Sequence, residues 1–189
     1  YFLKEFNNKF LDYQGPRSYL AYHDDKLFLV TGTGILAYGD IYNLVKNKNF
    51  KLKNINSNIR EVVKYKDFFM NSNFGVKGML IDKKSIYIAI SNEIREHCYN
   101  ISVLKSDINL DNLQFLYLFN PNECVEKNNT YGEFQPIQSG GVMEDFDKDH
   151  FLLTTGEFRF RDHAQNNNSV FGKILLINKN NGDHNIISK

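Results

Sequence analysis

The sequence lacks both a long apolar run and an excess of charge of one sign. Its formal net charge is +1, so it has no basic surface of the kind that proteins use to bind nucleic acid or anionic membranes. Without a run of about 20 apolar residues, no membrane-spanning helix is expected. The first residues contain no apolar segment with charged flanks, so no signal peptide is visible. The chain starts with tyrosine rather than methionine, and we expect that it has been processed, trimmed or only partly observed.

Tryptophan is also absent, and the aromatic residues are all tyrosine and phenylalanine. Hydrophobic residues make up 42% of the chain and charged residues 24%, which is typical of a globular protein with a real core. Asparagine is frequent, and asparagine and glycine favour turns because they tolerate positive φ. Many turns between β-branched or aromatic runs indicate an all-β fold. An AT-rich genome would enrich asparagine as well, and that explanation stays open.

Three apolar runs of β-forming residues recur about 60 residues apart, a periodicity that indicates a repeat architecture. They start at Lys26, Ser85 and His150, and each follows a charged turn and a shorter apolar strand. Each run is expected to continue into an outer hairpin. The expected hairpin strands are residues 99–106 and 113–119 in the second unit and residues 173–178 and 184–188 in the third, where an Asn-Gly step marks the turn.

Four antiparallel strands in about 60 residues, with a continuous apolar inner strand, are typical of propeller blades. We therefore predict an all-β fold, a β-propeller of four-stranded antiparallel blades, with about three blades of a six-bladed domain in this chain. The blades lie near residues 17–70, 71–134 and 135–189, and residues 1–16 form an N-terminal strand or linker. Three blades leave two sheet edges open, so the remainder of the propeller is expected from missing sequence or from another chain. A β-sandwich with chance spacing is the alternative.

The first group of candidate site residues is Gln138, Ser139 and Gly140, followed by Gly141. These residues are expected to begin the strand nearest the propeller axis. Glycine would let a flat cofactor or a sugar approach the backbone closely. Alternatively, the two glycines relieve crowding where the inner strands converge.

The second group lies in the polar loop from Glu157 to His163. If this loop is extended, Arg159 and Arg161 share one face and could contact a ligand through their guanidinium groups. Asp162 and His163 could form an acid–base pair. A surface network of arginine and aspartate that merely orders a long loop is the alternative.

The two cysteines, Cys98 and Cys124, flank the second outer hairpin. Pairing the strands about its turn brings them roughly opposite each other, so a disulfide is expected, with two free buried thiols as the alternative. A disulfide would imply an oxidising compartment, and the protein is expected to be periplasmic or secreted. Asp145, Asp147 and Asp149 alternate like calcium ligands but sit at a hairpin turn, where aspartate is common, and no metal site is expected in this segment.

A series of short motifs follows Phe74 in a fixed order. They are Gly75-Val76-Lys77-Gly78, residues 86–91, Gln138-Ser139-Gly140-Gly141, Thr154-Thr155-Gly156-Glu157, Ala164-Gln165 and residues 169–175. In these motifs the chain resembles the glucose/sorbosone dehydrogenase family, the soluble quinoprotein glucose dehydrogenases and aldose sugar dehydrogenases. The resemblance implies a six-bladed propeller that oxidises aldose sugars with pyrroloquinoline quinone (PQQ) and calcium at its axis. Both cofactors are implied by the resemblance alone and not by residues of this chain.

The chain departs from the family at the position that matters most for catalysis. The resemblance implies a histidine general base just before Gln138, where this sequence has Ile137. A well-placed base contributes about 10²–10⁴ in rate, and isoleucine cannot accept a proton. The family's glutamine before the first glycine motif falls at Asn73, and its quinone-contacting arginines would lie beyond Lys189. The sequence therefore predicts a sugar dehydrogenase-like propeller, with a non-catalytic propeller that binds a glycan or a protein as the alternative.

Overall fold

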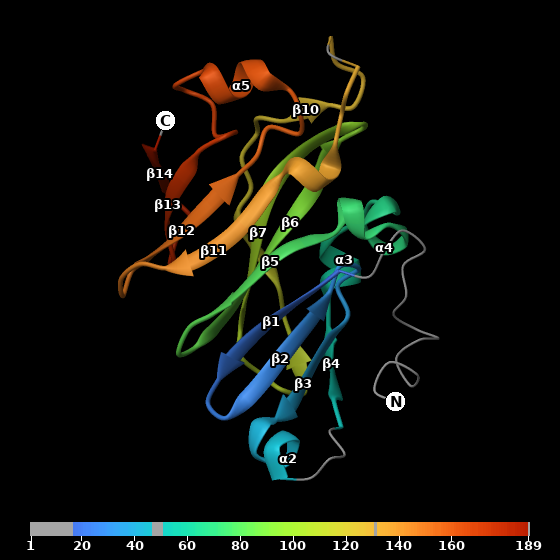
Figure 1. Ribbon diagram of the computed structural model, residues 1–189, viewed down its shortest axis with the longest axis vertical. Coiled ribbons are helices and arrows are strands. Elements are labelled where there is room, and N and C mark those ends of the chain that lie inside the picture. The colour runs from blue at the N-terminus through green and yellow to red at the C-terminus, as the bar shows by residue number, and fades with distance from the viewer. Residues whose placement is uncertain (1–16, 47–50, 131, 189) are drawn as a thin grey trace.

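The computed structural model describes residues 17–46, 51–130 and 132–188 (Figure 1). The N-terminal strand or linker expected at residues 1–16 lies outside the described residues. No helix of the described part is long and apolar enough to cross a bilayer.

The chain forms three sheets that follow one another in sequence. The first contains β1 (Ser18–His23), β2 (Lys26–Thr31), β3 (Leu36–Asp40) and β4 (Lys53–Ser57), with β8 (Asn112–Leu113) added in parallel to β4. The second contains β5 (Val76–Ile81), β6 (Ser85–Arg95) and β7 (Cys98–Asp107), and both β9 (Leu116–Phe119) and β10 (Val125–Glu126) pair with β7. The third contains β11 (Gly140–Asp145), β12 (His150–Thr155), β13 (Ile174–Asn178) and β14 (His184–Ser188).

The helices are short and lie at the ends of the sheets. They are α2 (Ile41–Lys46), α3 (Ile59–Val62), α4 (Asp67–Met70) and α5 (Arg161–Gln165), with 3₁₀ turns η1 (Ser72–Phe74) and η2 (Pro136–Gln138). Both 3₁₀ turns come just before an inner strand, η1 before β5 and η2 before β11. They contact each other beside the starting ends of β5 and β11.

The hairpins between the first two strands of each sheet are built alike. The carboxylates of Asp82 and Asp147 accept hydrogen bonds from the amides two and three residues further on, which closes the turns of the second and third sheets. The first sheet turns at residues 24–25, where both aspartates have positive φ. In each sheet, the backbone amide just after the third strand also donates a hydrogen bond to a carbonyl of this turn. The three bonds run from Ile41 to Asp25 (2.9 Å), from Ile108 to Lys84 (2.9 Å) and from Lys179 to Asp149 (2.8 Å).

The hydrophobic core consists of two clusters, one on each side of the second sheet. Strand β6 is buried on both faces, so its successive residues enter different clusters. Ile86, Ile88 and Ile90 pack with the first sheet, whereas Tyr87 and Ala89 pack with the third. The second sheet is therefore the middle blade of three, and each interface between blades is a core of its own.

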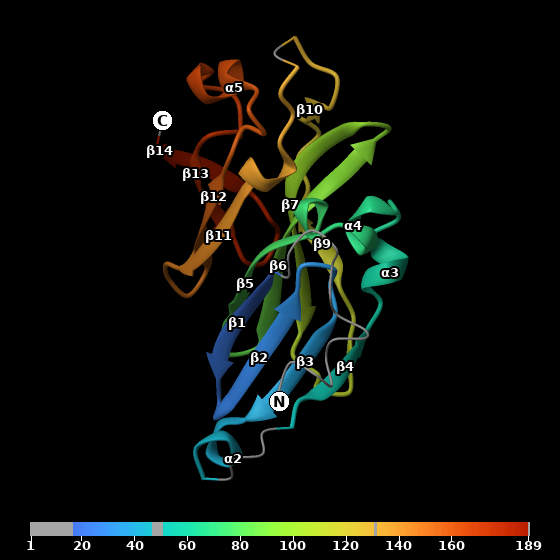
Figure 2. The same ribbon diagram turned by 45° about the vertical axis from the view of Figure 1, so that its right-hand side comes forward.

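The inner strands β1, β5 and β11 lie side by side, as Figure 1 and Figure 2 show from two directions. Gly78 and Gly141 make the close approach of β5 and β11 possible, because a Cβ at Gly78 would overlap the carbonyl oxygen of Gly141. A Cβ at Gly75 would likewise overlap the carbonyl oxygen of Gly32. The sheets thus converge at their inner strands and spread outward, which is the arrangement of propeller blades.

At the hairpin end, Lys179 joins the second and third sheets. Its side chain is almost completely buried, and its Nζ contacts a carboxylate oxygen of Asp145 and lies 3.8 Å from Oδ2 of Asp82. Burial raises the pKa of Asp82, but hydrogen bonds from the amides of Lys84 and Ser85, together with Tyr87 and Lys179, lower this pKa below its ordinary value. The buried cation is therefore paired with a charge from each of the two blades that it connects.

The prediction of an outer hairpin at residues 99–106 and 113–119 is only partly confirmed. Strand β9 returns along β7, but Leu113 pairs with the first sheet instead. The cause is Asn58, whose Oδ1 accepts from the amide of Phe115 at 2.7 Å and whose Nδ2 donates to the carbonyl of the same residue at 3.1 Å. This amide clamp, together with burial of Leu113 and Phe115, pulls the segment towards β4. The third outer hairpin forms as β13 and β14.

Candidate functional site

The same backbone hydrogen bond recurs in all three sheets at the starting end of the inner strands. The carbonyl of the residue before each inner strand accepts, and an amide on or just after the second strand donates. The pairs are Gly32 to Arg17 (2.6 Å), Ser91 to Gly75 (3.1 Å) and Gly156 to Ser139 (2.7 Å). Arg17, Gly75 and Ser139 thus lie directly before β1, β5 and β11, at the starting ends of the inner strands, which we call the axial end.

Gln138 and Ser139 occupy different environments although they are neighbours. Gln138 ends η2, not the strand, and is exposed, as is Ile137 before it at 43%. Ser139 is completely buried, and in the described part of the chain its Oγ has no hydrogen-bond partner. Of this group, Gln138 therefore presents its side chain to solvent at the axial end.

The two glycines that follow are required by their surroundings. Gly140 and Gly141 have φ of +77° and +111°, and β11 begins at Gly140. A Cβ at Gly140 would meet the backbone of Thr155 at 2.7 Å, and one at Gly141 would overlap the side chain of Lys77. Crowding between strands thus accounts for both glycines without a ligand.

Lys77 is a buried cation at this end that sequence reasoning did not single out. Its side chain projects from β5 beside Gly141, is 4% exposed, and donates through Nζ to the carbonyl of Asn73 at 2.5 Å. Burial, and to a smaller extent the charge of Arg17, lowers the pKa of Lys77 to about 7. No carboxylate among the described residues pairs with it. The only signal in the sequence is a lysine on an otherwise apolar inner strand.

The loop after β12 is not extended, which corrects the expectation that Arg159 and Arg161 share one face. Phe158 and Arg159 both have positive φ, and Arg161 begins α5. The cause is Phe158, whose completely buried ring stacks on Phe134 with centroids 5.5 Å apart and turns the backbone inward. Arg159 then lies at the surface, where its Nη1 is 3.4 Å from Oε2 of Glu133.

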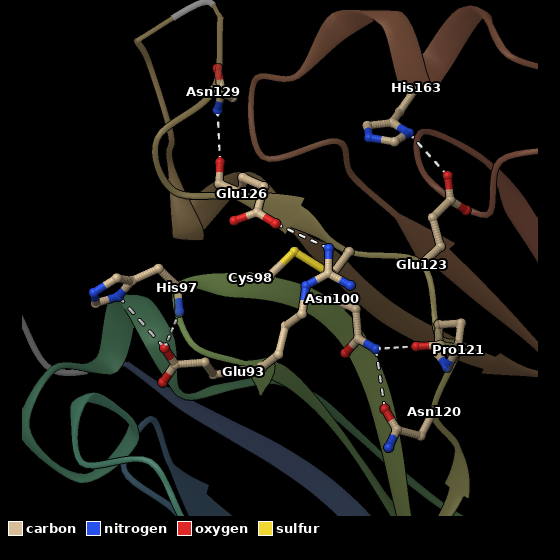
Figure 3. Close-up of a disulfide and its surroundings, with 12 residues drawn as sticks. Glu93, His97, Cys98, Asn100, Asn120, Pro121, Glu123, Glu126, Asn129 and His163 are labelled. Carbon is tan, nitrogen blue, oxygen red and sulfur yellow. Dashed lines mark hydrogen bonds and ion pairs between the residues drawn. A yellow bond between two sulfur atoms is a disulfide. The ribbon is translucent and has the colours of Figure 1, made fainter.

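The carboxylate that faces His163 belongs to Glu123, not to the neighbouring Asp162. His163 Nδ1 is 3.0 Å from Oε1 of Glu123, and the other carboxylate oxygen of Glu123 accepts from the amide of Val170 (Figure 3). This contact ties α5 to the segment before β10. The acid–base pair expected within the loop is thereby replaced by a link between two loops.

The structure brings some predicted residues together and separates others. The carbonyl of Gln138 accepts from the amide of Phe158 at 3.2 Å, so η2 and the start of the loop adjoin. Arg161 and Asp162 lie on α5 instead, at the outer part of the same blade (Figure 1). The candidate site nearest the axis therefore consists of Gln138, the backbone around Ser139 and the cations Arg17 and Lys77.

Cys98 and Cys124 form a disulfide between the start of β7 and the segment before β10. Among the described residues, no group of three or more histidine, cysteine, aspartate or glutamate side chains is placed to hold a metal ion. Asp147 caps its own hairpin turn, and Asp145 pairs with Lys179.

No family model matches the sequence, and no curated protein matches it either. Solved structures do match. A glucose dehydrogenase superposes on 92% of this chain with a TM-score of 0.64 and 14% identity, and 46% of that protein is covered. The apo-form of the soluble aldose sugar dehydrogenase from Escherichia coli gives a TM-score of 0.61 with 13% identity, over 87% of this chain and 47% of that one.

A third match is the PQQ-bound form of the aldose sugar dehydrogenase from Streptomyces coelicolor, with a TM-score of 0.53 and 11% identity. It covers 88% of this chain and 50% of that protein. The chain thus spans about half the length of the solved structures that it matches. At these identities the likeness shows the fold: this chain is a partial β-propeller of the kind found in soluble sugar dehydrogenases.

Proposed function

We propose that this chain is part of a sugar dehydrogenase-like propeller that oxidises aldose sugars with a quinone cofactor. The observation that carries the proposal is the match of all three blades to glucose and aldose sugar dehydrogenases, one of which is described as PQQ-bound. In this proposal Gln138 and the backbone of Ser139 and Gly140 line the axial end, and Arg159 lies on the loop beside it. Arg161 and Asp162 lie further out, on α5.

The described residues fit the two implied cofactors to different degrees. The quinone is an anion, and Arg17 and Lys77 lie at the axial end, where Lys77 has no carboxylate partner among the described residues. Arg17, and Lys77 in its protonated form, would attract the carboxylates of the quinone, and the quinone when bound would accept the two electrons of the sugar. For calcium, the described residues offer no group of three or more histidine, cysteine, aspartate or glutamate side chains that would hold the ion.

The second candidate function is a non-catalytic propeller that binds a glycan or a protein. Ile137 favours it, because an exposed hydrocarbon side chain stands where the family resemblance implies the proton acceptor. A shared fold does not fix a shared activity. The first function needs a group that removes the proton of the sugar hydroxyl and a quinone that accepts two electrons, whereas the second needs neither.

The decisive experiment incubates the full-length protein with PQQ and calcium and measures dye reduction with a panel of aldoses. Turnover supports the proposal, whereas the absence of both turnover and quinone binding overturns it. Binding on a glycan array without turnover would instead support the second function.

Two variants test whether the chain lacks only the general base or the whole active site. Ile137→His restores a base at the position that the resemblance implies, and Val142→His places the same group at another exposed apolar residue of the same blade. If dye reduction rises by about 10²-fold or more in the first variant alone, the chain is an enzyme that has lost its base.

The organisation around this site is also a proposal. We infer that the blades lie near residues 17–70, 71–134 and 135–189, and that sequence outside this chain or another chain supplies the rest of the propeller. The disulfide of Cys98 and Cys124 supports a periplasmic or secreted location, because disulfides persist in oxidising compartments.

A further inference from the structure

We propose that a groove on the middle blade binds an uncharged saccharide. The groove lies between the end of β6, the segment after α3 and the end of β9, and its volume is about 530 Å³. Small-molecule sites span roughly 300–1,000 Å³ and carry a few precisely placed polar groups. None of the residues that line this groove was among the site residues predicted from the sequence.

The groove rests on a buried network of amides and hydroxyls. Asn92, Asn100 and Ser102 are all buried, and they converge on the side-chain oxygen of Asn120 at 3.3, 3.1 and 2.9 Å. The close-up in Figure 3 shows Asn100 between Asn120 and the carbonyl of Pro121. A buried polar network whose members are satisfied holds its side chains in fixed orientations.

This network fixes the orientation of two groups that can contact a ligand, the side-chain amide of Asn120 and the ring of Tyr117. Because the oxygen of Asn120 is occupied, its Nδ2 is left as the donor, and no acceptor among the described residues receives a hydrogen bond from it. Tyr117 donates its hydroxyl to Oδ1 of Asn92 at 3.1 Å, which fixes a ring that is 37% exposed. A fixed donor beside a partly exposed aromatic ring suits a saccharide, which offers hydroxyl oxygens and an apolar C–H face.

The charges of the groove favour a ligand without net charge. Two cations, Lys64 and Arg95, and two carboxylates, Glu93 and Glu96, line the groove, and Nη2 of Arg95 also pairs with Oε1 of Glu126 at 3.0 Å. Glu93 is itself held in place, since its Oε1 accepts from the amide of His97 at 2.7 Å. A held carboxylate can accept hydrogen bonds from two adjacent hydroxyls of one sugar ring. An anionic ligand would face Glu93 and Glu96, and a cationic one would face Lys64 and Arg95.

The test is a titration of the full-length protein with glucose, maltose and N-acetylglucosamine, followed by nuclear magnetic resonance of the asparagine side-chain amides. Sialic acid and glucosamine serve as the charged comparisons. We expect saturable shifts of the Asn120 amide with at least one of the uncharged sugars and weaker binding of the charged ones. No saturable shift with any sugar, or shifts only around Gln138, would overturn the proposal.

Two variants each remove one of the two groups that we expect to contact the saccharide. Asn120→Asp keeps the oxygen that the network needs and removes the donor, whereas Tyr117→Ala removes the ring. Each is expected to weaken binding about tenfold, the order of effect of one lost aromatic contact or one lost hydrogen bond. Tyr42→Ala removes a more exposed tyrosine, on α2 and outside the groove, and is expected to leave affinity unchanged. If Tyr117→Ala does not fold, Asn120→Asp decides alone, and unchanged affinity in a folded variant contradicts the proposal.

The proposal of a saccharide groove and the proposal of sugar oxidation at the axial end can be tested separately. Dye reduction with PQQ is expected to be the same in Asn120→Asp as in the parent protein, because this residue is not at the axial end. Absence of dye reduction would count against sugar oxidation and would leave binding in the groove to be judged by the titration.

Discussion

At the scale of single residues, Lys77 contributes to the pH dependence of stability between neutral and basic pH. Its folded pKa is about 7 and its ordinary value is 10.5, so between these values the folded state binds fewer protons than the unfolded state. The free energy of unfolding therefore rises as the pH increases from about 7 to about 10. Below pH 7 both states are protonated and the full cost of burying the ammonium is present.

We predict that Lys77→Met stabilises the protein at pH 6 by roughly 2–4 kcal/mol, since each pKa unit corresponds to about 1.4 kcal/mol and relaxation relieves part of the cost. The difference from the parent should shrink as the pH rises towards 10. Urea denaturation at pH 6 and pH 9.5 measures both effects. Lys148→Met, at a side chain that is 90% exposed, is the matched control and should change little at either pH. A variant that is less stable than the parent at pH 6 would contradict this account.

Residue-level prediction from sequence succeeds for local contacts and fails for distant ones. The aspartates of the hairpin turns act as turn formers because their partners are two and three residues away. His163, by contrast, faces Glu123, which is far from it in the sequence, so local reasoning chose the adjacent Asp162. The burial of Lys77 could not be predicted from the sequence either, because lysine is almost never fully buried without a partner.

At the scale of secondary-structure elements, glycine determines how closely the inner strands approach. We predict that Gly78→Ala destabilises the protein by roughly 2–3 kcal/mol, because the added Cβ would overlap the backbone of Gly141 and force β5 and β11 apart. Gly132→Ala is the control: no atom lies within 4 Å of its Cβ position, and its positive φ costs only about 1 kcal/mol. Thermal unfolding of both variants compares the two costs. Equal losses would show that close approach of the strands is not what requires glycine at position 78.

The disulfide holds the outer part of the second sheet in place. It closes a loop between residues separated by 26 positions, for which loop entropy predicts a stabilisation of about 3 kcal/mol. We expect the double variant Cys98→Ala, Cys124→Ala to lose about this amount in urea denaturation. Dithiothreitol should lower the stability of the parent to a similar extent and leave that of the variant unchanged. A parent protein that does not respond to the reductant would contradict the assignment.

Elements with a clear alternation of apolar residues and a turn signal could be predicted, and those set by distant contacts could not. The three apolar runs and the third outer hairpin form strands where the pattern places them, but each run is the second strand of its sheet and not the innermost one, which is the shorter strand before it. The second outer hairpin breaks because Asn58 clamps Phe115 across 57 positions of sequence. The loop before α5 bends because Phe158 fits against Phe134, which alternation in the sequence does not reveal. The site residues of that loop were displaced for the same reason.

At the scale of the whole molecule, the first and third blades each have a face that no other blade covers. Leu20 and Tyr22 on β1 and Val142 on β11 are exposed, whereas both faces of the middle blade are buried in the two core clusters. In a propeller each blade face packs against the next blade. Apolar faces of this kind drive association when they remain open.

We therefore predict that the 189-residue chain, expressed alone, associates with a second copy of itself in a concentration-dependent manner through these faces. Leu20→Lys and Val142→Lys each place a charge on one open face and should weaken the association about tenfold or more, because burying an unpaired ammonium is unfavourable. Leu116→Lys introduces the same charge at an exposed leucine of β9, away from both inner strands, and should have little effect. Sedimentation equilibrium of the four proteins measures the association constants. A parent chain that stays monomeric at high micromolar concentration would show that the two open faces are stable when exposed to solvent. The inference that another blade or chain covers them would then be wrong.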